Sequence, residues 1–135
     1  MKKQFLLLLL AVVASLTGVQ AADRFVKFDS QPNALALKGA TIGYSDQDYE
    51  AVKIAIRSLQ DDMERVLGSK PQVTTDKPTI LIGTIGKNKA IDALKLKDLK
   101  GKREKFIITT FNGQLVIAGS DRRGTVYGIY ELSQQ

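Results

Sequence analysis

The segment QLVIAGSDRRGTVYGIYELS, residues 114–133, combines a strand, a turn and a helix. Its first five residues, Gln114–Ala118, are mostly apolar and include β-branched side chains, which is typical of a buried strand. A polar turn follows, in which Ser120 or Asp121 can cap the next helix by accepting hydrogen bonds from its first turn. This order predicts a helix that packs back onto the sheet to which the strand belongs.

The helix of this segment is expected to be amphipathic. Gly124 and Gly128 lie four residues apart on it. Because glycine lowers helix stability, this pair indicates a close approach to a strand or to another helix. The expected apolar face contains Val126, Ile129, Tyr130 and Leu132.

A hairpin is predicted immediately upstream. Phe106–Thr110 and Gln114–Ala118 flank Asn112-Gly113, the dipeptide that tight primed turns favour. Before the hairpin, Thr79–Ile82 is a continuous apolar run that predicts a buried central strand, and Gln72–Thr74 is expected to be a short edge strand. Asn88 can cap a shorter helix that ends at Leu94, and residues 95–105 form a lysine-rich surface connection.

A long amphipathic helix is predicted in the first half of the chain. Ser45 is expected to cap it, with Asp48 as a short equivalent of the glutamate in a capping box. Gly68, followed by Pro71, marks its end. The apolar residues that recur at three- and four-residue spacing are Val52, Ala55, Ile56, Leu59, Met63, Val66 and Leu67.

Three short extended segments are expected before this helix, at residues Arg24–Phe28, Ala34–Leu37 and Ala40–Gly43. The hairpin is antiparallel, whereas the connection from Thr79–Ile82 through the short helix is long enough for a parallel crossover. The sequence therefore predicts an α+β fold of two layers, with a mixed β-sheet and helices on one face.

The first 21 residues have the pattern of a secretory signal peptide. A short cationic start precedes an apolar run, Phe5–Leu16, that is too short for a stable transmembrane helix, and Val19-Gln20-Ala21 is a suitable cleavage site. The prediction is an exported protein, periplasmic or extracellular and with no membrane association after cleavage, in which residues 22–135 form one domain.

Composition excludes several kinds of chemistry. The chain has no Cys and no His, which rules out disulfides and histidine general-base catalysis and argues against a zinc site. No cofactor or metal is expected. The formal net charge of +6 falls by two when Lys2 and Lys3 leave with the signal peptide. Without an RNA-binding motif or zinc finger, this modest excess does not predict nucleic-acid binding.

Two glycine-containing loops are the candidate binding elements. Residues 83–88 (GTIGKN) and 119–124 (GSDRRG) each connect a strand to a helix, where backbone N–H groups and basic side chains can meet an anion. The first loop is not a P-loop, because only two residues separate its glycines and Asn88 follows the lysine. For both loops, a purely structural turn remains the alternative. If their strands are parallel, both loops lie at the sheet edge where α/β sheets bind ligands, but the strand order cannot be read from the sequence.

One arginine of the second loop can hold a carboxylate in a bidentate manner, or it can pair with Asp121 or a neighbouring acid. The candidate substrate-binding residues are Thr84, Gly86, Lys87, Ser120, Asp121, Arg122 and Arg123. No catalytic residue is assigned, because no pair of carboxylates of the kind that glycoside hydrolysis needs stands out.

The segments Leu81–Lys87, Leu99–Glu104 and Val116–Ser133 resemble the N-terminal domain of glycoside hydrolase family 115, the xylan α-1,2-glucuronidases. The same type of small α+β domain precedes the barrel in β-hexosaminidases and in family 67 α-glucuronidases. The resemblance implies a non-catalytic domain that supports a TIM barrel carrying the catalytic carboxylates.

The expected partners are that barrel, absent from these 135 residues, and a glucuronoxylan-type polysaccharide bound by the complete enzyme. The resemblance allows the two glycine loops to form one wall of the glucuronic-acid pocket. The alternative is a stand-alone exported module that binds a carbohydrate or an anion.

Overall fold

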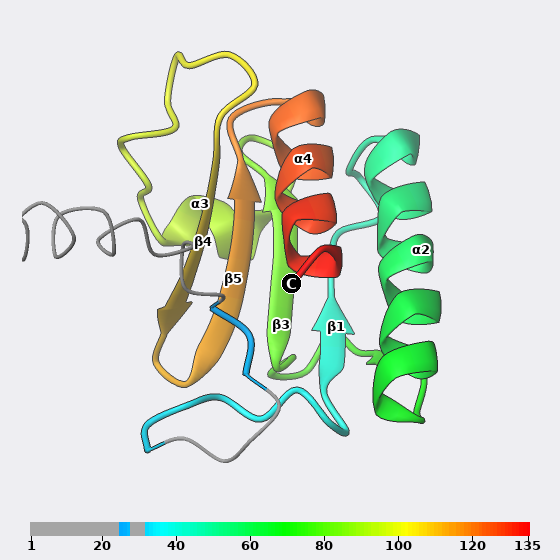
Figure 1. Cartoon of the computed structure of the whole chain (residues 1–135). Coiled ribbons are helices and arrows are strands. Elements are labelled where there is room, and N and C mark those ends of the chain that lie inside the picture. Colours follow the sequence, from blue (N-terminus) through cyan, green and yellow to red (C-terminus); the bar gives the residue numbers. More distant parts are fainter. Residues whose placement is uncertain (1–24, 28–31) are drawn as a thin grey trace, which may run out of the picture.

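The computed structural model describes residues 25–27 and 32–135 (Figure 1). The predicted signal peptide, residues 1–21, lies outside the described residues. The elements are β1 (Thr41–Gly43), α2 (Glu50–Leu67), β2 (Gln72–Val73), β3 (Ile80–Thr84), α3 (Lys89–Ala93), β4 (Phe106–Phe111), β5 (Gln114–Gly119) and α4 (Arg122–Ser133).

The strands form a five-stranded sheet in the order β2-β1-β3-β5-β4. The pairs β2–β1, β1–β3 and β3–β5 are parallel, and β4 pairs with β5 in the antiparallel sense. Asn112 and Gly113 have φ angles of 49° and 73°, as a primed hairpin turn requires. The predicted mixed sheet, hairpin, central strand and edge strand are therefore confirmed.

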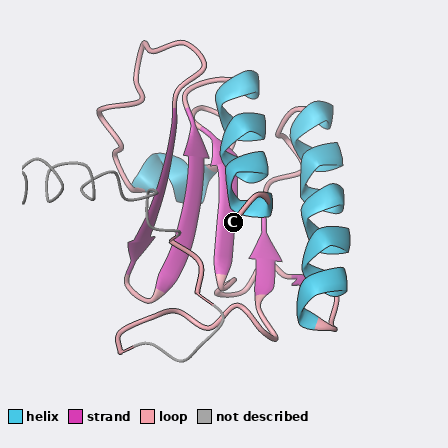
Figure 2. Ribbon diagram, in the orientation of Figure 1, coloured by secondary structure: helices cyan, strands magenta, loops and turns pink. Residues whose placement is uncertain are grey.

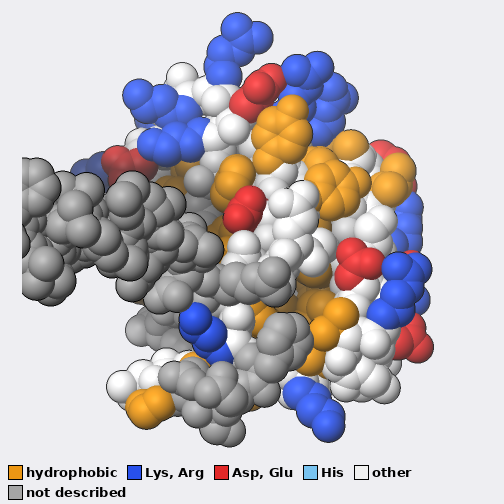
Figure 3. All heavy atoms as spheres, viewed as in Figure 1, with side chains coloured by type: hydrophobic (Ala, Val, Ile, Leu, Met, Phe, Trp, Pro, Cys, Tyr) orange, Lys and Arg blue, Asp and Glu red, His pale blue; other side chains and the backbone are white. Residues whose placement is uncertain are grey.

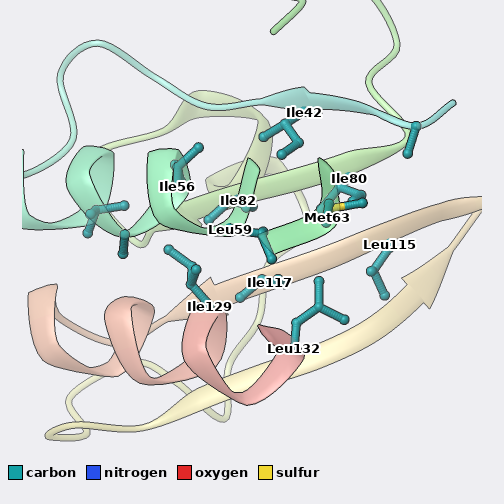
Figure 4. Packing of buried hydrophobic residues seen from close by; sticks show 13 residues of the cluster. Ile42, Ile56, Leu59, Met63, Ile80, Ile82, Leu115, Ile117, Ile129 and Leu132 are labelled. Carbon is teal, nitrogen blue, oxygen red and sulfur yellow. The ribbon is translucent and has the colours of Figure 1, made fainter. Parts of the chain in front are cut away.

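The two long helices cover one face of the sheet, where α2 and α4 lie side by side (Figure 2). Ile42, Ile82, Ile56 and Ile129 meet between these helices and the sheet (Figure 4). The expectation that helices share one face holds for α2 and α4. The short α3 instead packs on the opposite face, where its Ile91 belongs to a second, smaller cluster.

The burial of β3 on both faces explains its continuous apolar sequence. Ile80 and Ile82 join the cluster under α2 and α4, whereas Leu81 joins the cluster under α3. Successive strand residues point to opposite faces, so a strand covered on both sides needs apolar residues at every position.

The structure corrects the strands expected near the start of the chain. Ala34–Leu37 forms no strand, and neither do residues 25–27, the described part of Arg24–Phe28. Of Ala40–Gly43, the last three residues form β1. Because β2 and β3 occupy both sides of β1, no edge of it remains for another strand, and Leu35 and Leu37 pack against the core from a loop.

The start of α2 also differs from the prediction. The helix begins at Glu50, its N-cap is Tyr49, and no side chain caps it. Ser45 accepts a hydrogen bond from the backbone of Gln47 instead, so the predicted cap at Ser45 is wrong. The predicted end is confirmed, because Gly68 adopts the left-handed conformation with φ of 81°.

The cap of α3 was predicted correctly, whereas two residues of the predicted apolar helix faces are exposed. Asn88 caps α3 through the backbone N–H groups of Ala90 and Ile91, as expected. Val66 and Tyr130, placed in apolar faces from their spacing, are 62% and 43% exposed. Val66 lies in the last turn of α2, past the last buried residue of that helix, and Tyr130 lies on the side of α4 opposite its buried residues.

The expected close approach at the glycines of α4 is present. A Cβ atom on Gly124 would overlap the backbone carbonyl of Lys105, and one on Gly128 would lie 2.8 Å from Cγ2 of Ile117. Among the described residues, no helix has the length and apolar character needed to cross a membrane.

Candidate functional site

The two glycine loops lie next to each other at one edge of the sheet. Strands β3 and β5 are parallel neighbours, and their ends are in register, with Thr84 opposite Gly119. The backbone N–H of Ile85 donates to the carbonyl of Gly119 at 3.0 Å. Both loops therefore leave the carboxyl ends of adjacent parallel strands, the position where α/β sheets most often bind ligands.

A buried polar network lies directly beneath these loops. The carboxylate of Asp48, which is 5% exposed, accepts hydrogen bonds from the backbone N–H and the hydroxyl of Thr84, both at 2.9 Å. The Thr84 hydroxyl oxygen also lies 2.7 Å from that of Thr125, whose single proton is shared between this oxygen and the backbone carbonyl of Asp121 at 3.0 Å. Thr84 is thus buried, and its backbone N–H and hydroxyl are engaged by the fold.

The sequence pattern did not identify Asp48 as a residue of this site. Its spacing from Ser45 suggested a capping role, and only a parallel pairing that brings the start of α2 to the end of β3 reveals its partner. The sequence around an aspartate next to an amphipathic helix does not reveal whether its carboxylate is exposed or is buried as a hydrogen-bond acceptor.

The second loop is held to the chain that precedes β4. The carboxylate of Asp121 accepts from the backbone N–H of Gly124 at 2.8 Å and from that of Glu104 at 2.9 Å. The hydroxyl of Ser120 accepts from the backbone N–H of Lys105 at 3.0 Å. The predicted cap at Asp121 is confirmed, and both side chains have structural partners.

The two arginines have different surroundings. Arg123 forms an ion pair with Glu104 at 2.8 Å, so it takes the predicted alternative of pairing with a neighbouring acid. This contact raises the pKa of the Arg123 guanidinium, which keeps it charged. Arg122 is exposed and has no side-chain partner among the described residues. Arg122 is therefore the arginine that can turn to an external carboxylate.

Two backbone N–H groups of the first loop are hydrogen-bonded to acceptors of the fold. The N–H of Gly86 donates to the carboxylate of Asp92 at 2.8 Å, and the N–H of Lys87 donates to the carbonyl of Thr84 at 3.0 Å. The ammonium of Lys87 lies 5.0 Å from the ring centre of Tyr49, within cation–π range. The loop thus offers an external anion an exposed lysine and no convergent set of free N–H groups.

An open groove of about 950 Å³ lies beside the first loop, between α3, the end of β1 and the chain after β2. Of the candidate residues, only Gly86 and Lys87 line it. The structure therefore separates the candidates into Lys87 at this groove and Arg122 and Arg123 at the start of α4.

Asp121 gives this edge a pH-dependent stability. Hydrogen bonds from the backbone N–H of Glu104 and then of Gly124 lower the pKa of its carboxyl below the ordinary value of 3.8. Its contribution is therefore present above the pKa of the unfolded state and is lost as the pH falls through the lower pKa of the folded state.

Asp121→Asn is expected to lower the free energy of unfolding by about 1 kcal/mol at pH 6, because an amide offers one acceptor to two N–H donors. The difference from the wild type should shrink as the pH falls below 3.8. Urea unfolding between pH 6 and pH 2.5 measures it, with the exposed Asp98→Asn as control. A difference that stayed constant with pH would contradict this assignment.

Comparison with known proteins agrees with this architecture. The family model described as the N-terminus of glycosyl hydrolase family 67 matches residues 19–132. Among solved structures, the chain is similar to the family GH115 4-O-methyl-α-glucuronidase BtGH115A, described as specific for decorated arabinogalactans. The TM-score is 0.67 and the sequence identity is 32%, over 75% of this chain. No curated protein matches the chain by sequence.

The matched region is a small part of that α-glucuronidase, since it spans 14% of its length. The likeness to this structure is in line with the expected resemblance to family 115, whereas the family model that matches is that of family 67. The match to the family model covers most of the chain, from before the first described residue to the last turn of α4. The chain therefore belongs to the family of glycosyl hydrolase family 67 N-terminal domains.

Proposed function

We propose that this chain is the non-catalytic N-terminal domain of an exported α-glucuronidase that removes glucuronic acid, or its 4-O-methyl ether, from polysaccharides. The observation that carries the proposal is the family match together with the 14% share of an α-glucuronidase chain that the domain spans. Export is supported by the cationic start and apolar run of residues 1–21. Family 115 and a xylan α-1,2-glucuronidase activity are the specific form of this proposal.

The surroundings of the acidic residues support a non-catalytic role. Glycoside hydrolysis needs two carboxyl groups facing each other across the scissile bond, one of them able to protonate the leaving group. At the loop edge, Asp48, Asp121 and Glu104 are each engaged by N–H, hydroxyl or guanidinium donors of the fold. For Asp121, the two backbone N–H donors lower the pKa of its carboxyl, whereas the acid of a glycosidase must hold its proton near neutral pH.

The proposed contribution to the substrate pocket is electrostatic. A glucuronic-acid branch carries a carboxylate, and Arg122 is an exposed guanidinium at the start of α4, beside an ion-paired Arg123. Lys87, on the neighbouring loop, is the second candidate for this wall. Bidentate pairing with a carboxylate is the interaction that arginine makes best.

The first test is to sequence the gene beyond the codon for Gln135. The gene is expected to continue in frame into a catalytic domain, and the full-length enzyme should release glucuronic acid from glucuronoxylan or from glucuronidated arabinogalactan. The 135-residue chain should release none. A stop codon directly after Gln135, combined with saturable binding of either polysaccharide by the chain, would instead establish the stand-alone binding module.

The proposed wall is tested in the full-length enzyme with Arg122→Glu. Charge reversal should raise KM for the glucuronidated substrate by about ten-fold, the value of one charged hydrogen bond. The matched control is Arg65→Glu, an exposed arginine in the last turn of α2. If the two variants show equal KM and kcat, Arg122 does not belong to the pocket.

A further inference from the structure

An exposed apolar patch lies on the outer side of the two long helices. Tyr127 and Tyr130 on α4 are 45% and 43% exposed, and Ile54 on α2 is 49% exposed. Figure 3 shows hydrophobic side chains gathered over these two helices, next to the Lys and Arg side chains at the loop edge. We call Ile54, Tyr127 and Tyr130 the outer patch.

The outer patch is not accounted for by the packing of the domain. Ile129 and Leu132 on α4 already face the sheet and are buried, so the two tyrosines give the helix a second apolar side. A surface helix that packs on one side normally carries polar residues on the other. Exposed aromatic and aliphatic residues gathered over two neighbouring helices mark a surface that a partner covers (Figure 3).

The composition of this surface fits a protein partner. Tyrosine is enriched in protein interfaces because its ring is apolar and its hydroxyl finds a hydrogen bond. Exposed ion pairs lie on the same two helices, Glu50 with Lys53 and Arg57 on α2 and Arg123 of α4 with Glu104. An apolar centre with a charged rim is the usual anatomy of such an interface.

The position of the outer patch on α4 indicates which partner covers it. The matching family model is by description the N-terminus of larger hydrolases, and its match runs to residue 132, in the last turn of α4. The related α-glucuronidase has most of its chain outside the matched region. In such an enzyme, the polypeptide that follows this domain starts at the C-terminal end of α4, the helix that carries Tyr127 and Tyr130 (Figure 1).

We infer that the outer patch is the surface on which this domain docks onto the catalytic domain of the same polypeptide. The inference rests on the proposed function and adds the contact face to it. Docking through α2 and α4 leaves the sheet face that α3 covers directed away from the catalytic domain. It also places the start of α4, with Arg122, at the border of the interface.

Hydroxyl-radical footprinting tests this docking face. The labelling rates of Tyr127 and Tyr130 are measured in the 135-residue chain and in the full-length enzyme, with Phe111, 53% exposed near the hairpin turn, as the internal control. In the full-length enzyme the two tyrosines should be labelled about five-fold more slowly, as residues of an interface core are, with Phe111 unchanged.

Active full-length enzyme with unchanged tyrosine labelling would overturn the docking face and leave the proposed function intact. Failure of the gene to encode a catalytic domain would overturn both. Protection of the tyrosines already present in the 135-residue chain, accompanied by a dimer in light scattering, would assign the patch to self-association and also contradict the inference.

A double variant, Tyr127→Ser with Tyr130→Ser, gives a second readout. The unfolding midpoint of the 135-residue chain should shift by no more than about 2 °C, since both side chains are surface residues of the domain. In the full-length enzyme, the same change should accelerate proteolytic separation of the domain about ten-fold. Phe111→Ser is the matched control. Equal cleavage rates for both variants would contradict the docking face.

Discussion

Gly119→Ala is expected to destabilise the domain by about 3 kcal/mol, enough to unfold a substantial fraction of a domain of this size. Gly119 is the last residue of β5, and a Cβ atom there would overlap the backbone nitrogen of Thr125 and its hydroxyl. The obstacle is main chain in the first turn of α4, so no rotamer change can relieve it. Asp121 and Thr125 fix that turn through hydrogen bonds, which makes a shift of the helix costly.

The matched control is Gly86→Ala. Gly86 lies on the neighbouring loop with φ of 82°, and a Cβ atom there would meet nothing within 4 Å. The cost should be about 1 kcal/mol, that of a non-glycine residue in the left-handed region. Urea unfolding of both variants measures the difference. Similar losses for the two would show that the contact between β5 and α4 is looser than described.

The elements with strong local signals were predictable. Asn112-Gly113 specifies its turn without help from other elements, since both residues tolerate a positive φ. Gly68 ends α2 and Asn88 begins α3 for equally local reasons. By contrast, Tyr130 was expected in the core from its spacing, and only the packing of α4 on the sheet, beside α2, shows that it points outward.

Each loop of the candidate site was predictable from the sequence, but the contact between the two loops was not. Residues 83–88 and 119–124 each carry the composition of a strand-to-helix turn, but their contact depends on β3 and β5 being adjacent. Strand order follows from the sum of many weak packing preferences, and no residue in either loop encodes it. For the same reason the partner of Arg123, Glu104, could not be chosen from among the nearby acids.

Asp48→Ala is expected to cost about 3 kcal/mol and to loosen both long helices at once. The carboxylate is the acceptor for two buried donors of Thr84, and the loss of an acceptor leaves a buried N–H without a partner. It also accepts from the backbone N–H of Tyr49, the N-cap of α2. Through the hydroxyls of Thr84 and Thr125, the same group is connected to the first turn of α4.

Hydrogen exchange distinguishes this network from a local defect. In Asp48→Ala, amide exchange should accelerate in the first turns of both α2 and α4, although the carboxylate is linked to α4 only through the hydroxyl of Thr84 in the described hydrogen bonds. Asp46→Ala, an exposed aspartate two residues away, should change neither helix. Acceleration confined to α2 would mean that the Thr84–Thr125 contact does not transmit the effect. Because α2 and α4 also carry the outer patch, a loss of order in both should weaken docking in the full-length enzyme without altering any residue that touches the partner.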